Sequence, residues 1–99
     1  MNNINIKKLI EYPKTGIISK DIFKSKSENI SLFCMAAGSE LSEHTSTKKA
    51  FVYVIEGEGI FNLGNKRIKM NPGILISMKN NEVHSLKAIK NTSFILILT

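Results

Sequence analysis

Short apolar runs, each about as long as one β-strand, recur along the chain and are separated by Gly, Asn, Ser and Pro. The turn-forming residues between them return roughly every 8–12 positions, which is typical of an all-β sandwich or barrel. The runs that we expect to form strands cover residues 16–23, 30–37, 50–63 with a Gly-Glu-Gly break at 57–59, 64–70, 73–78, 83–88 and 93–99. Only residues 6–10 favour a helical turn, and weakly.

Two of these runs contain a stretch that is apolar on both strand faces instead of at alternate positions. In residues 50–55, successive side chains would alternate between the two faces of the strand. One face would carry Ala50, Val52 and Val54, and the other would carry Phe51, Tyr53 and Ile55. Residues 93–99 have the same character. A strand that is apolar on both sides is expected in the interior of a sheet with both faces covered. In a small β protein, a partner subunit can supply the cover for the second face of the sheet. We therefore expect a homodimer whose interface uses the outer faces of one edge sheet.

The chain has 99 residues and a net charge of +6. This length suits one domain, so we expect residues 1–99 to form a single unit. The basic residues are scattered lysines apart from Arg67, and no aromatic residues alternate with them. Nucleic-acid binding is therefore not indicated.

The single cysteine, Cys34, excludes an intramolecular disulfide, and its apolar surroundings favour a buried, inert thiol. No apolar run is long enough to span a membrane, and the first residues lack the order of a secretory signal. We therefore expect a cytoplasmic protein without a membrane partner.

The two histidines stand at regular distances from glycines. The first stretch begins at Gly38, which is followed by five residues and then His44, and it ends at Gly57. The second stretch runs from Gly73 to His84. In this respect the chain resembles the cupin family. That family carries one motif of Gly, five residues, His-x-His, three or four residues, Glu, six residues and Gly. Its second motif is Gly, five residues, Pro-x-Gly, two residues, His, three residues and Asn.

Several motif positions hold other residues here. Ser46 occupies the position of the second histidine, and Ala50 occupies that of the glutamate. In the second motif Lys79 replaces the proline and Ala88 the asparagine, while Asn81 replaces a glycine and can adopt the same left-handed turn. The resemblance covers residues 38–88 and implies an antiparallel double-stranded β-helix, the cupin jelly-roll barrel.

The resemblance also implies a metal site in those members that keep the full motif. Their histidines and glutamate hold Fe, Mn, Ni, Zn or a similar ion, so a divalent transition metal is the candidate cofactor here. Only His44 and His84 remain as good donors in this chain, and two imidazoles without a carboxylate do not form a facial triad. Candidate replacements are Glu43, which would need a β-bulge to face His44, and Cys34, Met35 and Met78.

These residues leave three functions open. The first, which we favour, is a small-molecule-binding module with a degenerate, weak or absent metal site. The second is a metal-dependent oxygenase or isomerase that uses His44 and His84 with a non-standard third ligand, and the third is a purely structural dimer. A Ser-His-Asp hydrolase is not supported, because Asp21 is the only aspartate. The residues expected to line the barrel pocket are His44, Ser46, Ala50, Val52, Met78 and His84.

Overall fold

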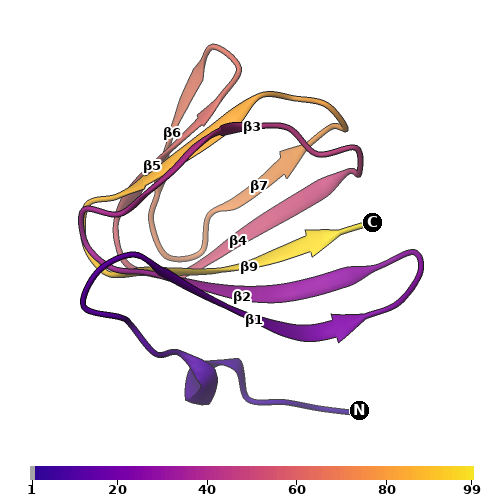
Figure 1. The fold of residues 1–99 in the computed structure, drawn as a ribbon, viewed down its shortest axis with the longest axis vertical. Coiled ribbons are helices and arrows are strands. Elements are labelled where there is room, and N and C mark those ends of the chain that lie inside the picture. Colours follow the sequence, from indigo (N-terminus) through magenta and orange to yellow (C-terminus); the bar gives the residue numbers. More distant parts are fainter. Residues whose placement is uncertain (1) are drawn as a thin grey trace.

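In a computed structural model, the described part of the chain, residues 2–99, forms nine β-strands and one short 3-10 turn (Figure 1). The turn is η1 (Ile6–Leu9), and the strands are β1 (Ile17–Lys24), β2 (Asn29–Met35), β3 (Glu40–His44), β4 (Ala50–Glu56), β5 (Gly59–Leu63), β6 (Lys66–Met70), β7 (Leu75–Met78), β8 (His84–Ala88) and β9 (Thr92–Leu98).

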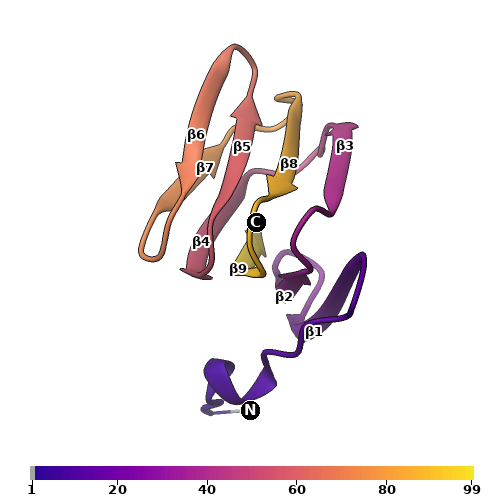
Figure 2. The ribbon, with the colours of Figure 1, turned by 90° about the vertical axis from the view of Figure 1, so that its left-hand side faces the viewer.

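The strands pair antiparallel throughout and form two sheets that lie face to face (Figures 1 and 2). The larger sheet has the order β1-β2-β9-β4-β7, and the smaller sheet has the order β3-β8-β5-β6. Alternate side chains of each strand point into the space between the sheets and form one apolar core. The prediction of an antiparallel jelly-roll barrel is confirmed.

Strands β4 and β9 lie in the interior of the larger sheet, where their doubly apolar sequences suggested. The inward side chains of β4, which include Val52 and Val54, are buried. The outward face is less well covered, because Tyr53 is 46% exposed and its partner on β7, Leu75, is 63% exposed. Within one chain the outer face of β4 is therefore left partly open, and its cover by a second copy stays a prediction.

The N-terminal segment lies against the outside of the larger sheet, on the side away from the smaller sheet (Figures 1 and 2). The Tyr12 hydroxyl donates a hydrogen bond of 2.6 Å to the Glu56 carboxylate. The Ser93 hydroxyl lies 3.0 Å from the Tyr12 hydroxyl oxygen. Lys20 on β1 donates to the backbone carbonyl of Leu9 at 2.8 Å. These contacts cover the outer positions of β2 and β9 and explain why Cys34 is fully buried.

Two turns require an unusual backbone conformation. Gly57 has a φ of +109°, and a Cβ atom there would lie 2.3 Å from the backbone oxygen of Asn91, so no other residue fits without a shift of the backbone. Asn81 has a φ of 67° and is the non-glycine residue with positive φ within residues 2–99. The left-handed turn predicted for Asn81 is confirmed, and its short polar side chain tolerates that conformation.

No helix between residues 2 and 99 is long and apolar enough to cross a membrane.

Candidate ligand-binding site

A β-bulge directs His44 toward the interior of the barrel. Leu41 pairs with Leu86 and His44 pairs with His84, so β3 uses one more residue than β8 over the same length. Leu41 lines the interior cavity, and strict alternation from it would direct Glu43 inward and His44 outward. The extra residue reverses this order and brings the two histidines opposite each other.

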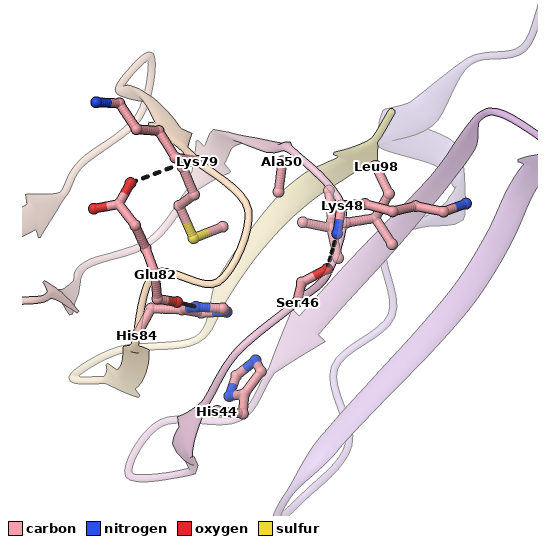
Figure 3. A pocket seen from close by; sticks show the side chains of 10 residues that line it. His44, Ser46, Lys48, Ala50, Lys79, Glu82, His84 and Leu98 are labelled. Carbon is pink, nitrogen blue, oxygen red and sulfur yellow. Dashed lines mark hydrogen bonds between the residues drawn. The ribbon is translucent and has the colours of Figure 1, made fainter.

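The two imidazole rings form a close pair in the wall of the cavity (Figure 3). Their centroids are 4.0 Å apart and the ring planes meet at 60°. The Nδ1 atom of His44 lies 2.7 Å from the backbone oxygen of Ser42, and that of His84 lies 3.1 Å from the backbone oxygen of Glu82. A carbonyl oxygen only accepts hydrogen bonds, so each neutral ring carries its proton on Nδ1 and presents the lone pair of Nε2.

His84 is the more enclosed member of the pair and is only 7% exposed. Its ring stacks on Phe61 with a centroid separation of 5.8 Å and an interplanar angle of 1°. Burial lowers the pKa of His84 below the ordinary value of 6.5, and the neighbouring His44 acts in the same direction. His84 is consequently a neutral hydrogen-bond acceptor at neutral pH.

The cavity next to the histidines has an outer and an inner lobe. The outer lobe has a volume of about 170 Å³ and is lined by His44, Ser46, Lys48, Ala50, Met78, Lys79, Glu82, His84, Leu96 and Leu98. The inner lobe has a volume of about 130 Å³ and is lined by Phe33, Leu41, His44, Val52, Phe61, Met78, His84, Leu86, Phe94 and Leu96. Both histidines, Met78 and Leu96 line both lobes, so they mark the junction.

The structure places the predicted pocket residues around this cavity. Of the six, Val52 faces the inner lobe alone, and the other five line the outer lobe. Ser46 does so from the loop after β3, because that strand ends at His44. The backbone N–H of Asn81 donates to the backbone oxygen of Ser46 at 2.6 Å and ties this loop to the turn before β8.

The other suggested metal donors lie elsewhere. Glu43 lines a depression on the outer side of the smaller sheet. Cys34 pairs with Ser93 on the covered outer face of the larger sheet, and Met35 belongs to the core but lines neither lobe. Of the four suggested replacements, only Met78 shares the cavity with the histidines.

The donor set does not fit the metal site that the family resemblance implies. Ser46 accepts a hydrogen bond from the backbone N–H of Lys48, and Ala50 offers no donor atom. Glu82 reaches the outer lobe, but one of its carboxylate oxygens accepts from the backbone N–H of Lys79 at 2.8 Å. Across the described residues, no three His, Cys, Asp or Glu side chains are grouped so that they could hold a metal ion. A facial triad is therefore not formed.

Several lining residues were not anticipated from the sequence. Glu82 lies in the turn before β8, outside the run expected to form a strand, so strand alternation could not place it. The three phenylalanines of the inner lobe come from β2, β5 and β9. Their meeting depends on how the two sheets are placed together, which the period of one strand does not specify.

The sequence of most of the chain matches a known family. The family model described as "Cupin domain" matches residues 31–99. The chain belongs to the cupin family. A search of curated proteins finds no match to the chain.

Solved structures share the same fold at low sequence identity. A cupin superfamily protein from Desulfitobacterium hafniense is 20% identical, with a TM-score of 0.90 over 96% of this chain and 87% of that one. An RmlC-like cupin from Desulfovibrio desulfuricans is 20% identical, with a TM-score of 0.88 over 100% and 96% of the two chains. A conserved protein of unknown function from Streptococcus pyogenes is 17% identical, with a TM-score of 0.89 over 99% and 86%.

Proposed function

We propose that this cupin is a binding module that holds a small organic molecule in the barrel, with the histidine pair as its polar anchor. The observation that carries the proposal is the orientation of the pair. Both Nδ1–H groups are engaged by backbone carbonyls, which leaves both Nε2 lone pairs for a ligand at the junction of the two lobes. An apolar pocket with a few fixed polar groups is the usual form of a small-molecule site.

Chemical-shift mapping with a library of small organic fragments tests this proposal. Fragments are expected to shift the amide signals of Met78, His84 and Leu86. The substitution Ala50→Leu fills part of the outer lobe, where Ala50 is only 1% exposed, and is expected to abolish these shifts. Ala37→Leu is the matched control, because Ala37 is exposed and outside the cavity. A library whose hits all map to the outer surface contradicts the proposal.

A metal-dependent cupin enzyme is the second candidate, and the position of Met78 is the observation in its favour. Its thioether lines both lobes together with the two histidines, so it is the available third donor. Thioether and imidazole suit soft ions better than the hard divalent ions that carboxylates hold. Under this candidate, His44→Ala and His84→Ala each remove the bound metal, and full metal retention in both variants contradicts it.

A further inference from the structure

The proposed function is the basis for a narrower statement about the ligand. We infer that the cavity is built for a neutral, single-ring compound that carries one hydrogen-bond donor, such as a phenol, with its ring in the inner lobe and its donor group on Nε2 of His84. Three features of the described residues lead to this chemical class: the type of the polar groups, the shape of the inner lobe and the position of the histidines between the lobes.

The polar groups at the junction accept hydrogen bonds. Imidazoles whose Nδ1–H groups are engaged by carbonyl oxygens offer Nε2 lone pairs, which match an O–H or N–H group and repel an anion. The cations at the cavity do not change this, because the side chains of Lys48 and Lys79 extend away from the histidines in opposite directions (Figure 3). The head group of the ligand is therefore a donor.

The inner lobe has the size and lining for one aromatic ring. Its volume is about 130 Å³, and an apolar cavity of roughly 150 Å³ is known to hold benzene. Phe33 and Phe94 of the larger sheet stack on each other with centroids 5.1 Å apart, and Phe61 faces them from the smaller sheet. Aromatic rings prefer such offset or edge contacts with other rings, and the Met78 thioether adds a further favourable contact.

The position of His84 connects the donor group of the ligand with its aromatic ring. Because His84 lines both lobes and stacks on Phe61, a ring held in the inner lobe beside Phe61 has its substituent next to the imidazole edge. A donor attached directly to the ring reaches Nε2 without entering the exposed part of the outer lobe. The burial of His84 strengthens this hydrogen bond, since water competes poorly there.

The matched pair phenol and toluene tests the inference by calorimetry, because the two differ only in a hydroxyl against a methyl group. Phenol is expected to bind the native protein about tenfold more tightly than toluene, although toluene is the more apolar molecule. The substitution His84→Phe removes the acceptor and keeps a ring beside Phe61, and it is expected to reverse the order. Tyr12→Phe, on the outer face of the larger sheet, is the control and is expected to keep the native order.

Equal or tighter binding of toluene by the native protein overturns the inference, and this result needs no variant that might fold poorly. Tighter binding of benzoate than of phenol also overturns it, because an anion would then be the preferred head group. If neither phenol nor toluene binds while other fragments shift the cavity signals, the ring inference fails and the proposed function stands. If no fragment shifts those signals, both fail.

Discussion

At the scale of single residues, the histidine pair decides what the cavity can do. Each ring is held by a backbone carbonyl two residues earlier in the chain, so its orientation is set by the local backbone of β3 or of the turn before β8. A backbone carbonyl on Nδ1 also orients many metal-ligating histidines, so what argues against a metal is the lack of a third grouped donor among the described residues and not the orientation of the rings. Each ring presents its Nε2 atom to the cavity as an acceptor.

The tautomers give the first prediction. Long-range ¹H–¹⁵N spectra at pH 8 are expected to show both rings protonated on Nδ1, because both Nδ1 atoms face carbonyl oxygens. As the pH falls, His84 is expected to stay neutral below 6.5, since burial lowers its pKa. Rings protonated on Nε2 at pH 8 would show that the lone pairs face the carbonyls and not the cavity.

At the scale of elements, the bulge in β3 is the feature that makes the site. It directs His44 inward and leaves Glu43 on the outside of the smaller sheet. Strict alternation over the same residues would place Glu43 inside and His44 outside, so the bulge decides whether a carboxylate or an imidazole faces His84.

Deletion of Glu43 tests the role of the bulge. Removing one residue gives β3 the same spacing from Leu41 to His44 as β8 has from Leu86 to His84, so strict alternation then directs the His44 side chain inward without a bulge. The fold should persist, and nuclear Overhauser contacts between the two imidazoles should remain. Glu43→Ala keeps the bulge and is the control. Loss of the imidazole pair in the deletion variant would mean that the backbone of the bulge itself, and not the side to which His44 points, positions the ring.

The N-terminal segment is a second element whose contribution can be measured. In a Tyr53→Phe background, the absorbance of tyrosinate reports Tyr12 alone, since the chain has two tyrosines. Burial and the hydrogen bond to Glu56 raise the pKa of Tyr12 from 10.0 to about 12, so the titration midpoint is expected there. The folded phenol holds its proton more tightly than the unfolded one. Its contribution to stability is therefore complete below pH 10.0 and is lost as the pH rises through about 12.

Removal of the Tyr12 hydroxyl supplies the matching stability measurement. Tyr12→Phe in the native background is expected to lower the free energy of unfolding by about 1 kcal/mol at pH 7, because it removes the hydrogen bond to Glu56. Urea denaturation measures this difference. An unchanged unfolding free energy together with a midpoint near 10.0 would indicate that the segment does not rest on the sheet as described.

At the scale of the whole molecule, we propose that the uncovered outer face of the larger sheet forms a homodimer. The outward side chains in the uncovered part of β4, β7 and β9 include Phe51, Tyr53, Leu75, Ser77, Ile95 and Ile97, and none of these carries a charge. Glu56 and Ser93, at the end of this face, are already engaged by Tyr12. Two copies that each bear +6 can meet there without opposing like charges. The exposed pair of Tyr53 and Leu75 would stand at the centre of such a contact.

Light scattering tests the dimer. The native protein is expected to be a dimer at tens of micromolar, and Leu75→Lys is expected to give a folded monomer, because it places a charge in the apolar face. Lys24→Ala, on the far edge strand β1, is the control and should leave the mass unchanged. A monomeric native protein at that concentration contradicts the proposal.

The sequence predicted most of the strands and the interior positions of β4 and β9, because alternation and turn residues act locally. It did not predict β3 (Glu40–His44), whose residues are mostly polar. Asn81 was expected in a left-handed turn, and its φ of 67° confirms that expectation. The bulge before His44 was not predicted, since one inserted residue leaves no mark in an already polar strand. The inner lobe was also missed, because Phe33, Phe61 and Phe94 come from strands that are brought together only by the packing of the two sheets.

We propose that His44 and His84 anchor an organic ligand and are not metal ligands. Elemental analysis of protein purified without a histidine tag tests this proposal most directly, in the native form and in the variants His44→Ala and His84→Ala. We expect far less than one Fe, Mn, Ni, Cu or Zn ion per chain, and no change in the variants, because the described cavity lacks a third strong donor. One chelator-resistant metal ion per native chain that is lost in both variants would contradict it.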